Sequence, residues 1–110
     1  ADINDDAKQQ LDTLAATLLD IAKQIPTNLP WILRIDGHTD AVPIHTQQFP
    51  SNWELSTARA VAVAKYLISR GVPPDRLAPT GFGEFHPLDP RATEEAYRRN
   101  RRIELKLTDR

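Results

Sequence analysis

A charged segment follows the most apolar short run of the chain. The run 31–36 leads directly into Gly37-His38-Thr39-Asp40. Ligand sites in α/β folds favour the carboxyl end of a buried strand, where a carboxylate such as that of Asp40 can meet a cation. Gly37 is expected to let the backbone turn sharply at this point. Thr and Asp also stabilise ordinary loops by bonding their own backbone, so a turn and a binding site are both compatible with this segment.

A second polar group lies on the helix predicted after a long loop. Asn52, Ser56 and Arg59 are spaced i, i+4 and i+7 and therefore share one helix face, with Leu55 in the same group. An arginine in the first turns of a helix opposes the helix dipole unless it meets an anion. A solvated arginine is commoner in general, but the polar stripe running beside the apolar one weakens that interpretation. Arg59 is therefore a candidate anion-binding residue.

A third group enters the last predicted strand. Alternation along that strand places Arg102 on the solvent face and Arg101, which has the same parity as Ile103, on the side of the helices. A cation on a buried side needs a partner. Asp40, Glu54 or a ligand carboxylate could supply it, and the sequence leaves these three open.

Composition excludes several classes of function. The 110 residues suit one domain, residues 1–110, and contain 14 Lys and Arg against 15 Asp and Glu. A net charge of −1 is too even to predict a nucleic-acid partner or an anionic membrane surface through bulk charge. The absence of cysteine excludes disulfides and thiolate metal sites. No apolar run is long enough to span a bilayer, so membrane attachment would require a segment outside this chain.

Metal binding and catalysis have weaker support. His38, Asp40, His45 and His86 are candidate metal ligands, and His38 with Asp40 could serve a metal-dependent hydrolase of the cell wall. Their spacing matches no recognised zinc signature. No nucleophile–base pair or pair of tuned carboxylates stands out either. We therefore predict neither an enzyme nor a cofactor.

Three helices are predicted from periodicity and capping residues. The first runs from about residue 4 to 25 behind an Asn4 cap, the second from a capping box at 51–54 to about residue 70, and the third from 93 to about 100. Gly71 is placed for a left-handed C-cap of the second helix. The core stripe of the second helix is predicted to be Val61, Ala64, Leu67 and Ile68.

Three strands are predicted, at 31–36, 77–82 and from residue 102 onward. In the last of these, Ile103, Leu105 and Leu107 alternate with charged residues, which predicts one buried and one solvated face. The first two strands should be parallel across a right-handed crossover, and the last can join antiparallel. The fold class is therefore α/β, a two-layer sandwich in which helices pack on a mixed sheet of about three to four strands. The long loop 41–50 is of the kind that carries function.

Six ordered pieces of the chain resemble one family. They are residues 34–40, 52–60, 67–73, 76–77, 81–84 with Pro87, and 100–104. Together they cover nearly the whole chain and resemble the OmpA-like peptidoglycan-binding domains. Val42-Pro43-Ile44 and the Asn-Trp-Glu-Leu run 52–55 are similar to the MotB-type branch of flagellar stator proteins. The resemblance also implies a strand before the first helix, of which this chain would hold at most the end.

The resemblance implies non-catalytic binding of the peptidoglycan stem peptide through its meso-diaminopimelate. In the family, the aspartate matching Asp40 meets the ammonium of that residue, and the arginine matching Arg59 meets its carboxylate. The full set of expected ligand-binding residues is Asp40, Arg59, Arg101, Asn52, Thr39 and Leu55. A fixed carboxylate and a planar guanidinium are also what a zwitterion requires by simple chemistry.

The resemblance further implies a place and a partner. The domain is expected in the periplasm, as the soluble part of a protein anchored in the inner membrane, where it would attach that protein to peptidoglycan. A homodimer is compatible with this arrangement. The alternative is a protein-interaction or dimerisation module of a MotB-like membrane protein that has lost wall binding.

Overall fold

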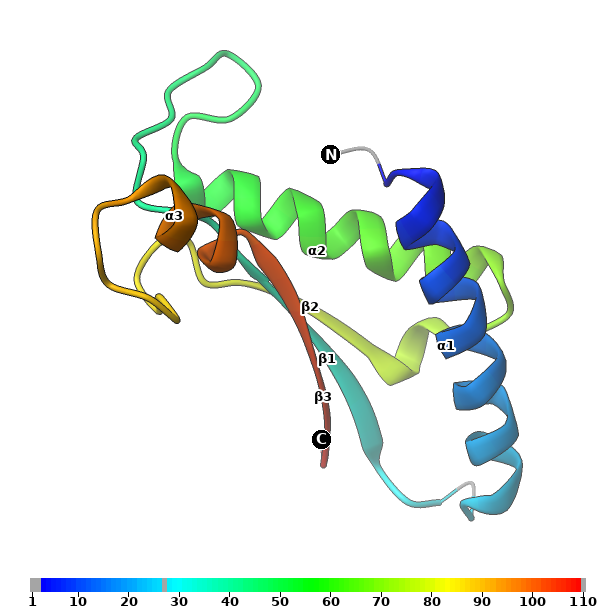
Figure 1. Cartoon of the computed structure of the whole chain (residues 1–110). Coiled ribbons are helices and arrows are strands. Elements are labelled where there is room, and N and C mark those ends of the chain that lie inside the picture. The colour runs from blue at the N-terminus through cyan, green and yellow to red at the C-terminus, as the bar shows by residue number, and fades with distance from the viewer. Residues whose placement is uncertain (1–2, 27, 110) are drawn as a thin grey trace.

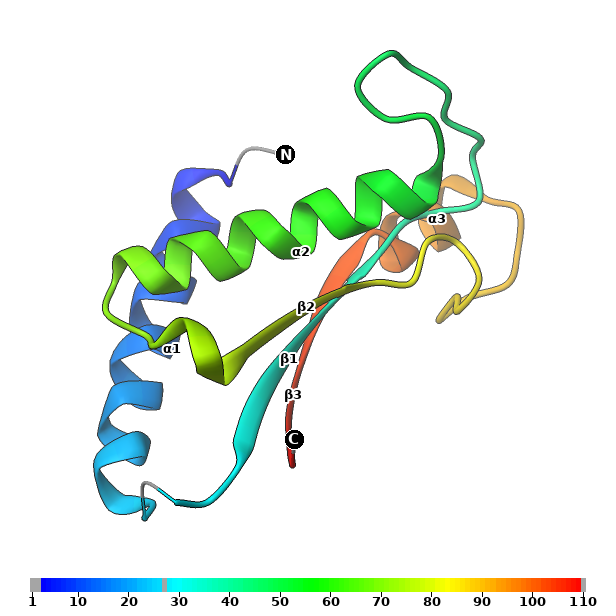
Figure 2. The ribbon, with the colours of Figure 1, turned by 180° about the vertical axis from the view of Figure 1, so that it is seen from behind.

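The computed structural model describes residues 3–26 and 28–109. Its elements are α1 (Asp5–Gln24), β1 (Trp31–His38), α2 (Asn52–Ser69), the short 3-10 helix η1 (Pro74–Arg76), β2 (Leu77–Gly81), α3 (Glu94–Asn100) and β3 (Arg102–Asp109). β1 is the central strand, parallel to β2 and antiparallel to β3. In Figures 1 and 2, α2 runs along the sheet, and α1 crosses the C-terminal half of α2. The predicted α/β sandwich with a mixed sheet is confirmed.

The hydrophobic core lies between the sheet and the two long helices. Alternate residues of β1, Leu33 and Ile35, face the helices and are 4% and 0% exposed. The helical residues that bury against them are Ala15, Leu18, Ala60, Val63, Ala64 and Leu67. This cluster fixes the helices over one face of the sheet only, and so leaves the other face to polar side chains.

The predicted core stripe of α2 was partly wrong. Ala64 and Leu67 are buried, but Ile68 is 39% exposed and Val61 is only half-buried. Apolar residues occupy every position from 60 to 64, so the sequence leaves the rotation of the helix ambiguous. Ala60 and Ala64 are small, and the structure turns this side toward the sheet because it permits the closest approach.

Gly37 does not form the predicted turn. β1 continues through it to His38, and Gly37 pairs with Gly81 of β2. A Cβ built on Gly37 would lie 2.2 Å from the backbone oxygen of Ser56, and one on Gly81 would lie 2.0 Å from Thr57 Oγ1. Two neighbouring glycines are therefore needed because the N-terminal half of α2 rests directly on the sheet.

The helix ends agree with the predicted caps. Asn4 caps α1, and Ser51 caps α2 by accepting a hydrogen bond from Trp53 N while its hydroxyl bonds Glu54. Gly71 adopts the left-handed conformation, with φ of 102°. No described helix is long and apolar enough to cross a membrane.

The last strand is less buried than predicted. Ile103 is half-buried, but Leu105 and Leu107 are 39% and 57% exposed. β3 pairs with β1 and with no other described strand, so it forms an edge that the helices cover incompletely. Of the strand implied before α1, residues 3 and 4 form no part, and residues 1–2 lie outside the described residues.

Candidate functional site

A cavity of about 340 Å³ opens at the carboxyl end of β1. We call it the charged pocket. Its lining residues are Thr39, Asp40, Val42, Pro43, Ile44, Asn52, Leu55, Arg59 and Arg101. The structure therefore brings together all six residues that the sequence predicted to share a site. They come from three segments that are far apart along the chain.

Each wall of the charged pocket is positioned by a neighbouring element. β1 ends at His38, so Asp40 lies just beyond the edge of the sheet. The two-glycine contact holds the first turns of α2 against that edge, which places Asn52, Leu55 and Arg59 beside the strand end. Arg101 is the C-cap of α3, directly before β3 begins, and its side chain reaches Asp40.

The Asp40 carboxylate is held in a fixed orientation. Its Oδ1 accepts a hydrogen bond from Val42 N at 3.0 Å, and its Oδ2 accepts one from Arg101 Nη1 at 2.5 Å. The second amino group of Arg101 donates to Glu94 Oε1 at 3.1 Å. The hydrogen bond to Asp40, and then the one to Glu94, raises the pKa of the Arg101 guanidinium. Of the three partners considered for Arg101, the structure selects Asp40.

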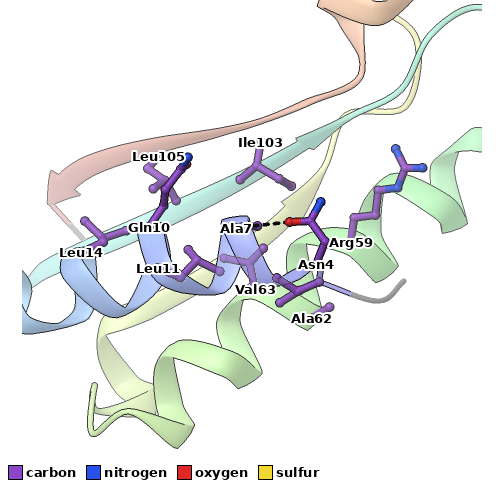
Figure 3. A pocket seen from close by; sticks show the side chains of 11 residues that line it. Asn4, Ala7, Gln10, Leu11, Leu14, Arg59, Ala62, Val63, Ile103 and Leu105 are labelled. Carbon is purple, nitrogen blue, oxygen red and sulfur yellow. Dashed lines mark hydrogen bonds between the residues drawn. The ribbon is translucent and has the colours of Figure 1, made fainter.

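Arg59 differs from Arg101 because its side chain makes no hydrogen bond or ion pair with any described residue. It is half-buried on α2, and its guanidinium extends away from the helix (Figure 3). The linked side chains of Asp40, Arg101 and Glu94 carry one net negative charge. The charged pocket thus contains a net anion on one side and an unpaired cation on α2.

Asn52 and Thr39 are buried and fix the wall of the pocket. Both are 4% exposed. Asn52 Nδ2 lies 3.3 Å from Asp40 O, 3.2 Å from Val42 O and 3.2 Å from Glu84 Oε1, so its amide ties α2 to two loops. The Thr39 hydroxyl donates to Asp40 O at 2.9 Å. Both residues therefore hold the backbone that carries the Asp40 carboxylate.

Ser56 shares a helix face with Asn52 and Arg59 but does not line the pocket. It is fully buried, donates to Trp53 O at 3.0 Å and accepts from Gly83 N at 2.9 Å. Sequence reasoning also missed Glu84 and Glu94, which contact Asn52 and Arg101. Glu84 belongs to a matched sequence piece and could have been found, whereas nothing in the sequence distinguishes Glu94 from other exposed acids.

A second cavity, of about 460 Å³, lies between α1, α2 and β3 (Figure 3). We call it the apolar cavity. Its lining residues are Ile3, Asn4, Ala7, Gln10, Leu11, Leu14, Arg59, Ala62, Val63, Ile103 and Leu105. Arg59 lines both this cavity and the charged pocket. The apolar cavity was not predicted, because incomplete cover of the edge strand leaves no signature in the sequence.

His38 and Asp40, two residues apart, have different surroundings. The His38 ring stacks on Phe82 with centroids 5.0 Å apart, and its Nε2 lies 3.8 Å from Glu104 Oε2. Burial lowers the pKa of the His38 imidazole, and the charge of Arg102 lowers it further. No cluster of three or more His, Asp or Glu side chains within residues 3–26 and 28–109 could hold a metal ion. The geometry gives no support to a hydrolase site built on His38 and Asp40.

Comparison with known proteins identifies the family. The sequence pattern of the OmpA family matches residues 1–101. The chain belongs to the OmpA family. The predicted resemblance is thereby confirmed.

Individual OmpA-family relatives place the chain near the MotB branch. It is 35% identical to motility protein B of Bacillus subtilis over 92 residues, which cover 83% of this chain and 35% of that protein. It is 41% identical to the peptidoglycan-binding protein ArfA of Mycobacterium tuberculosis over 71 residues, which cover 64% of this chain and 21% of that protein. The chain thus spans about a third of the length of the first of these relatives and about a fifth of the length of the second.

A solved structure agrees with this placement. The C-terminal domain of Helicobacter pylori MotB, residues 125–256, superposes with a TM-score of 0.82 at 28% identity. The match covers 99% of this chain and 78% of that one. The predicted similarity to the MotB-type branch is therefore confirmed in both sequence and fold.

Proposed function

We propose that this OmpA-family chain binds peptidoglycan without catalysis, by holding the meso-diaminopimelate of the stem peptide between Asp40 and Arg59. The observation that carries the proposal is the charged pocket, in which a fixed carboxylate and an unpaired guanidinium line one cavity. The distal carbon of diaminopimelate carries both an ammonium and a carboxylate, so it matches these two groups.

The two ends of the ligand would be held by different kinds of contact. The Asp40 carboxylate has lone pairs beyond those used by Val42 and Arg101, and these can accept from an ammonium. The planar fork of Arg59 suits a carboxylate, which it can hold with two parallel hydrogen bonds. Arg101 would orient Asp40 rather than bind the carboxylate, because its guanidinium already bridges Asp40 and Glu94.

The proposed role of the whole chain is anchoring. Acting as one domain over residues 1–110, it would attach a larger envelope protein to the wall from the periplasmic side. Each charge-assisted hydrogen bond contributes roughly 1.5–3 kcal/mol, and ordering the ligand offsets much of this. A single stem peptide would therefore bind at micromolar affinity or weaker, and several copies on one polymer would supply firm attachment.

Sedimentation with purified sacculi tests the proposal. Wild-type chain should sediment with sacculi, and Asp40→Asn and Arg59→Ala should each stay in the supernatant while remaining folded by circular dichroism. Arg98→Ala is the matched control, because Arg98 is an exposed arginine on α3 outside the charged pocket. Binding of both pocket variants at wild-type levels would rule out the proposed site.

The apolar cavity favours a second candidate, a protein-interaction or dimerisation module. Leu105 lines the cavity and is 39% exposed, and Leu107 farther along β3 is 57% exposed. Exposed apolar surface of this kind is typical of contact with another chain. Analytical ultracentrifugation of the isolated chain, with and without sacculus fragments, distinguishes the candidates. A dimer that ignores the fragments would support the second.

A further inference from the structure

Two large aromatic rings lie exposed against each other beside the charged pocket. Trp53, in the first turn of α2, is 49% exposed, and Phe85, in the segment after β2, is 57% exposed. Their ring centroids are 4.9 Å apart, and the ring planes meet at 30°. We call these two residues the aromatic pair. Clustered apolar side chains in water are unfavourable in a free domain and therefore mark contact surfaces.

The aromatic pair is held firmly in place. Gly83 lies beneath both rings, since a Cβ built on it would be 3.3 Å from the Phe85 ring and 3.4 Å from the Trp53 ring. The Gly83 backbone is fixed at both ends: its N donates to Ser56 Oγ at 2.9 Å, and its O accepts from Thr39 N at 2.9 Å. The Gly83 backbone therefore limits the positions that the two rings can adopt.

One residue connects the aromatic pair to the charged pocket. Asn52 lines the pocket, and its Nδ2 donates to Glu84, the neighbour of Phe85 in the chain. Trp53 directly follows Asn52. Asn52 therefore links the wall of the charged pocket to the two segments that carry the aromatic pair.

We propose that the aromatic pair binds a sugar ring of the glycan strand that carries the bound stem peptide. This inference rests on the function proposed above. The C–H face of a pyranose ring packs on aromatic rings, while its hydroxyl groups stay in water. The sugar is joined to the bound end of diaminopimelate through the side chain of that residue, two further residues and the lactyl group of the sugar, a span of roughly 15 Å when extended. A stem held in the charged pocket therefore leaves its sugar within reach of the first turn of α2 and of the segment after β2.

The test compares two soluble ligands with the wild-type chain. One is the free tripeptide that ends in meso-diaminopimelate, and the other is the same tripeptide attached to its disaccharide. Wild type should bind the disaccharide form more tightly by about 2- to 10-fold, the usual gain from an aromatic contact. Trp31 is 8% exposed, so a change in tryptophan fluorescence on adding the disaccharide form would report on Trp53.

Variants of the aromatic pair should remove only the preference for the tripeptide that carries the disaccharide. In Trp53→Ala and Phe85→Ala, affinity for the free tripeptide should stay at the wild-type value, while the gain from the disaccharide is lost. Trp53→Tyr should keep the gain, because it keeps an aromatic face. Leu107→Ala is the matched control, since Leu107 is equally exposed but lies on β3 outside both cavities.

The outcomes separate the two proposals. If wild type binds both ligands equally, or if the alanine variants keep the preference, the sugar contact is wrong and the peptide site stands. If wild type binds neither ligand, the proposed function fails and the sugar contact fails with it. Loss of the preference in the alanine variants alone supports both.

Discussion

The charged pocket and the apolar cavity meet at Arg59 but differ in how they are built. The charged pocket lies where three segments converge at the end of the sheet, and its polar groups are oriented by hydrogen bonds from Val42, Arg101 and Asn52. The apolar cavity lies between α1 and the edge strand and is lined mostly by aliphatic side chains. One cavity is organised around charge, and the other is a gap left in packing.

This difference predicts that one cavity governs ligand binding and the other governs stability. Oriented charges raise affinity for a charged ligand without the cost of rearrangement, so changes in the charged pocket should act on binding. Unfilled apolar volume forfeits dispersion contacts and hydrophobic burial, so changes in the apolar cavity should act on stability. Each prediction below either tests that division or makes it sharper.

The largest expected effect is on binding and comes from Arg59, the residue shared by both cavities. Arg59→Ala should weaken binding of the diaminopimelate tripeptide by about 10- to 100-fold, as expected for loss of a charge-assisted pair of hydrogen bonds. Its free energy of unfolding should change by less than about 0.5 kcal/mol, because Arg59 has no described polar partner. Calorimetric titration and urea unfolding measure the two quantities. A variant that unfolds easily but still binds would assign Arg59 to the apolar cavity instead.

The next effect comes from the contact that sets the geometry of the charged pocket. Gly37→Ala would place a Cβ 2.2 Å from Ser56 O, so α2 must move away from β1. The free energy of unfolding should fall by about 1–3 kcal/mol, and affinity for the tripeptide should fall as well. Urea unfolding and titration of the same sample test this. Unchanged affinity in a destabilised variant would show that the position of α2 does not govern the pocket.

A smaller effect should follow from filling the apolar cavity. Ala7→Leu extends a side chain from α1 into that space and should raise the free energy of unfolding by about 0.5–2 kcal/mol. Tripeptide affinity should not change. Ala16→Leu, at an exposed position of the same helix outside the cavity, is the control for helix propensity. Equal stabilisation by both variants would mean that the cavity is not the cause.

The smallest effect concerns the sheet face that neither cavity touches. Burial, and then the charge of Arg102, lowers the pKa of His38, so the unfolded chain binds a proton more readily than the folded one. The contribution of neutral His38 to the free energy of unfolding should therefore be fully present above about pH 6.5. It should be lost as the pH falls from there through the pKa of the folded state. Urea unfolding at several pH values, repeated with His38→Gln, measures this contribution. An unchanged pH slope in that variant would assign the effect to other groups.

Charge motifs proved more predictable from sequence than packing. Local spacing placed Asp40 after a strand, and Asn52, Leu55 and Arg59 at the start of a helix. The family resemblance added that these residues share a site with Arg101, and all five line the charged pocket. Helix caps were predictable for the same reason, since a cap depends on local hydrogen bonds.

Features that depend on distant contacts were not predictable. The role of Gly37 is set by Ser56 on another element, and the exposure of Leu107 is set by the helices that fail to cover β3. Ile68 was assigned to the core because neighbouring apolar residues made the phase of α2 ambiguous. The pairing of Arg101 with Asp40 was one of three options that local sequence could not separate.

The most direct test removes the distal carboxylate from the ligand. Calorimetric titration should compare the tripeptide ending in meso-diaminopimelate with the same peptide ending in lysine, which keeps the ammonium and lacks the carboxylate. Wild type should prefer the diaminopimelate peptide by about 10- to 100-fold, and Arg59→Ala should bind both peptides equally weakly. Equal affinity of the wild type for the two peptides would contradict the claim that Asp40 and Arg59 hold opposite ends of one amino acid.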